Sequence, residues 1–261
     1  MQNNLSITLK KLNIKLALFD VDDTLVETYN HFVTARENLK QELATACNVG
    51  FEEISTLYDQ LNQQAKELYH VDPTKIWDFV FNGIKLKYPT ANTALLDQYQ
   101  KDYVKTLYQE EIPLKPGVIE LLKAFKEAGI HLGIVTNAEA DWTFRKLEAV
   151  GITHYFEPSR IFIIPPNQKK DLEHWQDAMQ AAKPQTVMVF GDNFPVDILP
   201  CIKLGAIAVF VNDPTHLPPA FSQGYTENEH STIRISSYSQ LVLELEKFFK
   251  IKGIRTADPT L

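Results

Sequence analysis

Several features that mark other classes of protein are missing from this sequence. It has only two cysteines, Cys47 and Cys201, and their positions match no metal-binding or redox spacing, so we expect reduced structural thiols. Residues 1–15 hold no long apolar segment ahead of a cleavage site, so no secretory signal is predicted. No apolar run approaches the roughly 20 residues that a membrane helix needs. We therefore expect a soluble cytoplasmic protein. Export by a route that needs no N-terminal signal stays an alternative.

Basic residues are in the minority. The chain has 26 Lys and Arg against 33 Asp and Glu, a formal net charge of −7. Proteins that bind nucleic-acid duplexes usually carry a basic excess, so no such partner is expected. A negative protein that handles an anionic substrate needs a local positive site, and a bound cation can supply it. Hydrophobic residues make up 44% of the 261 positions, which predicts a globular fold with a substantial core.

Short apolar runs, typical of buried strands, alternate along the chain with amphipathic segments typical of helices. The predicted strands are 16–19, 131–135, 187–190 and 207–211, with weaker candidates at 161–164 and 232–235. The predicted helices are 118–128, 142–150, 172–182, 196–204 and 239–249. This alternation predicts an α/β fold with a parallel, doubly wound sheet.

One segment breaks the alternation. Residues 32–108 contain no convincing strand but four apolar-periodic stretches, and Pro73 and Pro89 fall between them, where helices would stop. We expect an all-helical module, 30–111, inserted into a core formed by 1–29 and 112–251. The last residues, 252–261, are expected to form a weakly ordered tail.

Acidic and hydroxyl residues follow the first predicted strand directly, at Asp20, Asp22, Asp23 and Thr24. Crowded carboxylates raise one another's pKa, and the crowding costs stability unless a cation relieves it. Mg²⁺ is the natural candidate because it prefers oxygen ligands. The alternative is a helix N-cap with an acidic first turn.

Two further strands end in polar residues: Gly191-Asp192, with Asp197 five positions later, and Thr136-Asn137. Ligands of open α/β sheets bind beyond the carboxyl ends of the strands, so these side chains would meet at one edge. Gly191 would let the backbone turn sharply, and Thr136 with the following backbone N–H groups can hold phosphate oxygens. Each pattern alone is also explained by an ordinary capped turn.

Phosphoryl transfer needs positive charge near the transferred group. Lys169 and Lys170 precede the helix that leads to the strand before Gly191, and either can supply that charge. A solvated pair of charges is the alternative.

Together these residues resemble the haloacid dehalogenase-like (HAD) superfamily. Residues 20–25 resemble its first motif, Asp-x-Asp-x-Thr, residues 136–137 its second, and residues 191–197 its fourth, Gly-Asp-x-x-x-x-Asp. The third motif has a lysine with an aromatic residue six positions later, which selects Lys169 with Trp175. Lys170 stays a rival because it stands in place of the family's usual proline.

The resemblance implies a fold and a mechanism. The fold would be a Rossmann-like parallel sheet with an inserted helical cap of type C1, which would close over the site and select substrate. Asp20 would attack phosphorus and form an aspartyl-phosphate, while Asp22 would protonate the leaving oxygen and later activate water. Dehalogenases of this family typically lack an Asp where Asp22 stands, because halide leaves without a proton. Asp23 stands where many members have Gly, and Asp tolerates turn conformations.

The resemblance also implies the ligand-binding residues. The metal ligands for Mg²⁺ would be the Asp20 carboxylate, the Asp22 main-chain carbonyl, Asp192 and, directly or through water, Asp197. The phosphate-binding residues would be Thr136, Asn137 and Lys169.

The predicted function is therefore Mg²⁺-dependent hydrolysis of a phosphate monoester, with a small metabolite such as a sugar phosphate or nucleotide as substrate. Phosphotyrosine on a protein is an alternative, because the inserted helices are rich in aromatic residues: Tyr58, Tyr69, Trp77, Phe79, Phe81, Tyr88, Tyr99, Tyr103 and Tyr108. Packing between the helices also explains those aromatics. A third reading is a non-catalytic scaffold that binds a partner, although every catalytic residue type is present. A fourth is a phosphomutase, which would have to retain the phosphoryl group.

Overall fold

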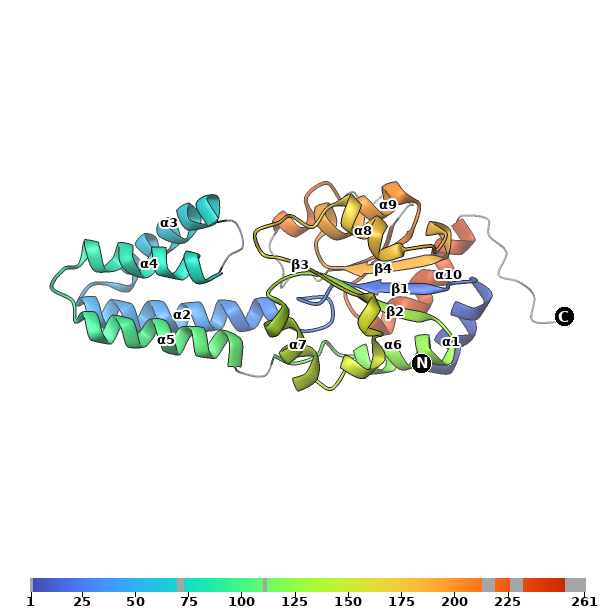
Figure 1. Ribbon diagram of the computed structural model, residues 1–261, viewed down its shortest axis with the longest axis horizontal. Helices are drawn as coiled ribbons and strands as arrows, with labels where there is room; N and C mark the ends of the chain where they lie inside the picture. The colour runs from blue at the N-terminus through green and yellow to red at the C-terminus, as the bar shows by residue number, and fades with distance from the viewer. Residues whose placement is uncertain (1, 70–72, 110–111, 213–218, 226–231, 252–261) are drawn as a thin grey trace. The chain divides into compact units, whose positions relative to one another are not determined.

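The computed structural model describes residues 2–69, 73–109, 112–212, 219–225 and 232–251 (Figure 1). The predicted tail, 252–261, lies outside these residues. The chain divides into two compact units. The first comprises Met1–Tyr29, Ile112–Ile164 and Lys169–Leu261, and the second comprises Asn30–Glu111 and Pro165–Gln168. Each unit has its own hydrophobic core.

A parallel six-stranded sheet in the order β3-β2-β1-β4-β5-β6 forms the centre of the first unit. The strands are β1 (Leu16–Phe19), β2 (His131–Asn137), β3 (Ile161–Ile164), β4 (Val187–Gly191), β5 (Ile207–Val211) and β6 (Thr232–Ile235). All six predicted strands are present. The predicted α/β class with a parallel sheet is confirmed.

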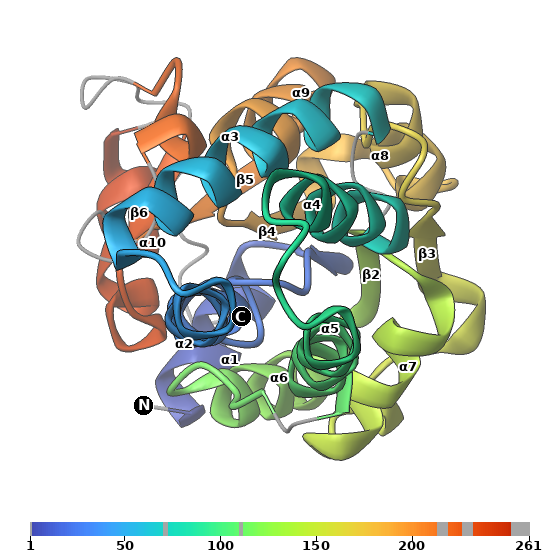
Figure 2. The ribbon, with the colours of Figure 1, turned by 90° about the vertical axis from the view of Figure 1, so that its left-hand side faces the viewer.

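Helices cover both faces of this sheet (Figure 1). They are α1 (Gln2–Lys11), α6 (Val118–Glu127), α7 (Ala140–Ala149), α8 (Leu172–Met179), α9 (Leu199–Leu204) and α10 (Leu241–Ile251). Figures 1 and 2 show α8 and α9 on one face and α1 and α6 on the other. A sheet covered on both faces explains why its strands are continuous apolar runs rather than alternating patterns.

The central strand shows how the sequence builds these layers, because successive side chains point to opposite faces. Leu16 and Leu18 belong to the cluster under α8 and α9, which includes Trp175. Phe19 points the other way and packs edge-on against Phe125 of α6, with ring centroids 6.0 Å apart. Every residue of β1 is buried, so this strand has no face left for solvent.

Two local features differ from the sequence prediction. Helix α1 was not predicted, yet Leu5 and Leu9, four residues apart, are buried in it. That spacing puts both on one helical face and was the available signal. The predicted helix 196–204 begins as a π-helical turn, Phe194–Ile198, and becomes regular only at Leu199. Such turns often occur at functional sites.

The second unit is helical. Its elements are α2 (Thr28–Cys47), α3 (Phe51–Tyr69), α4 (Pro73–Lys87) and α5 (Thr93–Gln109), and Figure 2 views α2 and α5 nearly end-on. Tyr58, Phe81 and Tyr103 are buried in its core, with other aromatic rings packed around them: Trp77, Tyr88 and Tyr99. The large exposed hydrophobic side chains described in this unit are aliphatic, Leu68 and Leu86. Helix packing therefore accounts for these six aromatic side chains. The side chain of Tyr108 lies outside the part of the chain that the structure describes.

Both cysteines are free thiols, and Cys201 is buried. None of the helices in the described part of the chain combines the length and apolar character that a membrane span needs.

Candidate active site

The residues predicted at the strand ends meet at one edge of the sheet. β1 lies between β2 and β4, and Phe19 is in register with both Ile134 and Phe190. The N–H of Asp20 donates to the carbonyl of Phe190 at 2.9 Å, so the first residue after β1 is fixed beside the end of β4. Parallel pairing in this register is what brings separate stretches of the sequence together.

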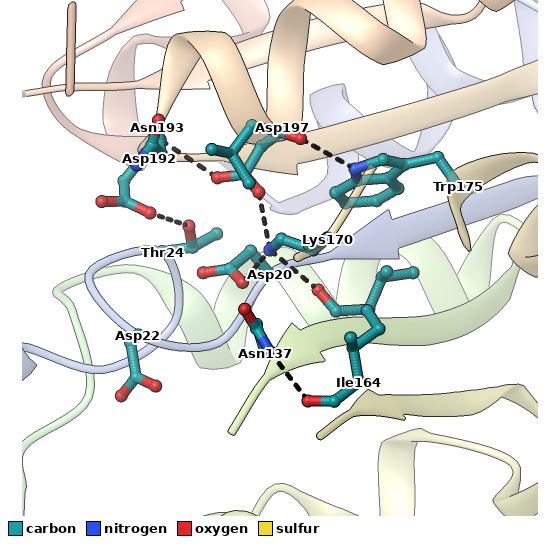
Figure 3. Close-up of polar contacts among 12 residues, drawn as sticks. Asp20, Asp22, Thr24, Asn137, Ile164, Lys170, Trp175, Asp192, Asn193 and Asp197 are labelled. Carbon is teal, nitrogen blue, oxygen red and sulfur yellow. Dashed lines mark hydrogen bonds and ion pairs between the residues drawn. The ribbon is translucent and has the colours of Figure 1, made fainter. Parts of the chain in front are cut away.

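Three buried carboxylates form the centre of this edge (Figure 3). Asp20, Asp192 and Asp197 each offer an oxygen, and the three oxygens lie within 4.8 Å of one another. Nζ of Lys170 lies 2.5 Å from Oδ1 of Asp20 and 2.6 Å from Oδ1 of Asp197, and it also donates to the carbonyl of Val135 at 3.2 Å. Two of the three carboxylates, Asp20 and Asp197, thus contact the same ammonium.

Burial and crowding shift the pKa values of this cluster. Burial raises the pKa of Asp20 from 3.8 to about 7, with Lys170 opposing the shift and Asp197 adding to it. Burial, and then the charges of Asp20 and Asp197, raise the pKa of Asp192 well above its usual value. Burial alone would lower the pKa of Lys170, but Asp197 and Asp20 outweigh it and raise that pKa. Lys170 therefore stays protonated, but its single positive charge does not balance the three carboxylates.

This cluster fits a divalent cation. Its donors are carboxylate oxygens, which hard cations such as Mg²⁺ prefer, and they already lie close enough to share one ion. A second positive charge beside Lys170 would also offset the burial of three carboxylates.

The structure corrects the choice between the two lysines. Lys169 is exposed, whereas Lys170 is buried among the carboxylates, with its Nζ 5.3 Å from the centre of the Trp175 ring. Trp175 in turn donates from Nε1 to the carbonyl of Val196 at 3.0 Å. Trp175 thus packs against Lys170, five positions earlier in the sequence, and not against Lys169, six positions earlier. Lys170 stands directly before Asp171, the N-cap of α8.

Gly191 is required for a different reason from the one predicted. It is absent from the residues with positive φ, so it does not serve a left-handed turn. A Cβ at this position would lie 2.2 Å from Cβ of Asp197 and 2.7 Å from its Oδ2. Only glycine lets the end of β4 pass this close to Asp197.

We expect Gly191→Ala to destabilise the protein by at least about 2 kcal/mol, because the new methyl group must displace Asp197 or the backbone of β4. Urea unfolding followed by circular dichroism measures this free energy. Gly50→Ala is the matched control: a Cβ there has no atom within 4 Å, and we expect less than about 1 kcal/mol. Equal effects of the two substitutions would contradict this account of Gly191.

The Asp22 side chain lies apart from the three carboxylates (Figure 3). Its Oδ1 accepts a hydrogen bond from Oγ1 of Thr28 at 2.5 Å and forms a short ion pair with Nζ of Lys146. Lys146 is on α7 and is buried, and it belongs to none of the predicted motifs. The available signal was its position: it lies four residues after Trp142, on the buried face of α7.

Asp23 adopts the left-handed conformation, with φ of 55°, at the place where many members of the resembling family have Gly. Its carboxylate accepts the N–H of Tyr29 at 2.9 Å, in the first turn of α2. Burial raises the pKa of Asp23 to about 6, although this hydrogen bond lowers it. Asp23 therefore shapes the turn and caps a helix.

The remaining predicted residues lie at the same edge. Thr136 is buried near the end of β2, and Asn137 donates from Nδ2 to the carbonyl of Ile164 at 2.9 Å. Thr24 donates to Oδ1 of Asp192 at 3.4 Å. Tyr238 was not among the predicted residues. Its buried hydroxyl donates to the carbonyl of Thr24 at 2.7 Å and so stabilises the loop after β1.

A family model for haloacid dehalogenase-like hydrolases matches residues 14–205, which include all of these site residues except Tyr238. The chain belongs to this family. The superfamily assignment made from the sequence motifs is therefore confirmed.

Curated relatives of the chain are phosphatases. Glyceraldehyde 3-phosphate phosphatase of Methanocaldococcus jannaschii is 26% identical over 234 residues, covering 88% of this chain and 96% of the relative. Phosphoglycolate phosphatase of Thiobacillus denitrificans is 27% identical over 186 residues, covering 70% and 76%. These matches confirm the predicted enzyme class, a hydrolase of this family, and agree with phosphoric monoesters as its substrates.

The fold has a solved counterpart in a haloacid dehalogenase-like family hydrolase from Xanthomonas campestris. The TM-score is 0.70 at 14% sequence identity, and the match covers 92% of this chain and 94% of the other. At this identity the likeness supports the Rossmann-like fold and carries no information about substrate.

Proposed function

We propose that this hydrolase is a Mg²⁺-dependent phosphatase that acts on small phosphorylated metabolites, sugar phosphates in particular, through an aspartyl-phosphate on Asp20. The observation that carries the proposal is the convergence of three buried carboxylates and Lys170 at the strand ends. The names of the curated relatives support the substrate class.

The side chains can divide the reaction between them. An oxygen of Asp20 forms a bond to phosphorus, and no base is needed because an ionised carboxylate is already a nucleophile. As the ester P–O bond breaks, Asp22 gives its proton to the leaving oxygen. Water then attacks the aspartyl-phosphate, Asp22 takes a proton from that water, and Asp20 is released with inorganic phosphate.

The other site residues would bind the phosphoryl group. Thr136 can donate from its hydroxyl and Asn137 from its backbone N–H, while Lys170 supplies a fixed positive charge. Asp20, Asp192 and Asp197 would hold Mg²⁺ together with the main-chain carbonyl of Asp22. Bound there, the ion would supply positive charge to the phosphate oxygens and keep the neighbouring carboxylates ionised.

Asp22 favours ester hydrolysis over dehalogenation. A leaving alkoxide needs a proton, whereas halide does not, so a carboxyl group two residues after the nucleophile serves a phosphatase. The aromatic side chains that pack in the core of α2–α5 give no support of their own to a phosphotyrosine substrate.

A phosphate-release screen tests this function. We expect release from at least one three- to six-carbon phosphate ester with kcat/KM of at least about 10⁴ M⁻¹s⁻¹ in Mg²⁺, and almost none after EDTA treatment. Phosphotyrosine peptides form the comparison arm, and we expect them to react at least about 100-fold more slowly. Release that EDTA leaves unchanged would refute the metal dependence, and faster cleavage of the peptides would favour a phosphoprotein substrate.

A further inference from the structure

Lys146 occupies a place where a lysine is normally costly. Lys146 belongs to α7, and its side chain is only 5% exposed. Burial of an ammonium without a partner is strongly unfavourable. Two groups compensate: the carboxylate of Asp22 and the face of the Trp142 indole, whose centre lies 3.7 Å from Nζ. Trp142 lies one helical turn before Lys146, so α7 itself supplies one of these two partners.

The ion pair differs from a surface pair between neighbouring residues. Lys146 and Asp22 are 124 positions apart, and only the fold brings them together. Thr28 donates to the same oxygen, Oδ1, from the opposite end of the loop after β1. Asp22 keeps 29% of its side chain exposed, so the contact restrains the carboxylate without closing it off.

Two donors on a single oxygen have a geometric consequence. With Oδ1 anchored by Lys146 and Thr28, the rotation of the carboxylate is fixed, and Oδ2 is the oxygen left to carry a proton. An acid that gives and then retakes a proton must present the same oxygen in both steps, and small displacements of such a group reduce rates severely.

We propose that Lys146 is a positioning residue that holds Asp22 so that Oδ2 gives the proton to the leaving oxygen and takes one from water. This role rests on the proposed phosphatase function. Lys146 does not touch the phosphoryl group; it acts through Asp22. As the P–O bond breaks, its electron pair stays on the leaving oxygen, which takes the proton from Oδ2 of Asp22, and the resulting carboxylate remains paired with Lys146.

The dependence of rate on the leaving group tests this role. An alkoxide leaves poorly without a proton, whereas 4-nitrophenolate needs little help. We expect Lys146→Met to lower kcat/KM about 100-fold for an alkyl phosphate such as glyceraldehyde 3-phosphate, and less than about threefold for 4-nitrophenyl phosphate. Across substituted phenyl phosphates, log kcat/KM should fall more steeply with leaving-group pKa than in the wild type.

Three further variants complete the test. Arg145→Met removes the neighbouring exposed cation of α7 and should leave both rates and the slope unchanged. Lys146→Arg keeps the charge and should restore part of the alkyl phosphate rate. Asp22→Asn should steepen the slope in the same way, and adding Lys146→Met to it should cost little more, because both changes remove one function.

The possible results separate the two proposals. Equal losses on both substrates, with an unchanged slope in a folded Lys146→Met protein, would overturn the positioning role and leave the phosphatase function standing. Loss of all activity in both Lys146 variants together with a lowered melting temperature would also overturn it, since that marks a structural ion pair. A wild-type protein that hydrolyses none of the esters would refute the proposed function and the positioning role with it.

Discussion

Asp20→Asn is expected to lower kcat/KM for phosphate ester hydrolysis by at least about 10⁴-fold, because the amide cannot form the acyl phosphate. The substitution keeps the shape of the side chain and removes one of three crowded negative charges. Folding should therefore survive it, and the free energy of unfolding should not fall by more than about 1 kcal/mol. Steady-state phosphate release with the best substrate of the screen measures the activity.

The control for this variant is Asp177→Asn, the same change at an exposed position of α8, where we expect activity within about twofold of the wild type. Trapping provides a second readout. Rapid acid quenching of the wild type with radiolabelled substrate should leave phosphate on the protein, and the Asp20 variant should hold none. Appreciable turnover by the Asp20 variant would exclude this residue as the nucleophile.

Lys170→Met is expected to lower kcat/KM by about 10²- to 10³-fold, whereas Lys169→Met should change it less than twofold. The two lysines are adjacent in sequence, but only Lys170 lies beside Asp20 and Asp197. This pair is a matched comparison, since each variant removes one ammonium from the same segment. A larger loss from the Lys169 variant would reverse the assignment of the site lysine.

The Lys170 variant should also be less stable without Mg²⁺, by about 3 kcal/mol near pH 8, because three buried carboxylates then have no cation. The direction in which this loss of stability changes with pH follows from the raised pKa of Asp20. A carboxyl group whose pKa is raised by folding favours the folded state at low pH and loses that contribution as pH rises from about 4 to about 7. The difference between variant and wild type should therefore shrink at pH 5.

Thermal unfolding in EDTA at pH 5 and pH 8, with and without added Mg²⁺, measures this dependence. Mg²⁺ should restore part of the lost stability at pH 8 and little at pH 5, because protonated carboxyls bind metal poorly. A loss of stability that does not vary with pH would mean that Lys170 contributes packing rather than charge.

Much of the candidate site could be predicted because the chemistry depends on short, contiguous motifs. Asp20, Asp192 and Asp197 were identified from acidic residues at or shortly after strand ends, whereas the strand order that brings them together is known only from the structure. The site lysine was not fixed by the sequence. The two lysines are adjacent and chemically identical, and only the structure shows that Lys170 is buried and Lys169 exposed.

Lys146 and Tyr238, in contrast, could not be predicted from the sequence. Lys146 contacts Asp22 from 124 positions away, and the Tyr238 hydroxyl reaches the carbonyl of Thr24 from 214 positions away. Neither belongs to a motif, since each acts through a single contact whose partner is far off in the chain. The only sign of either residue in the sequence is that a polar side chain stands among positions that are buried.

The sequence by itself determined the α/β class, the parallel sheet and the identity of the acidic residues, because strand patterns and strand-end motifs are local. Only the tertiary structure decided that Lys170 rather than Lys169 is buried, that Gly191 makes room for Asp197, and that Asp22 is held by Lys146 and Thr28. These outcomes depend on distances between segments that are remote in the chain. Such distances are set by how the sheet and its helices pack, and no local pattern encodes them.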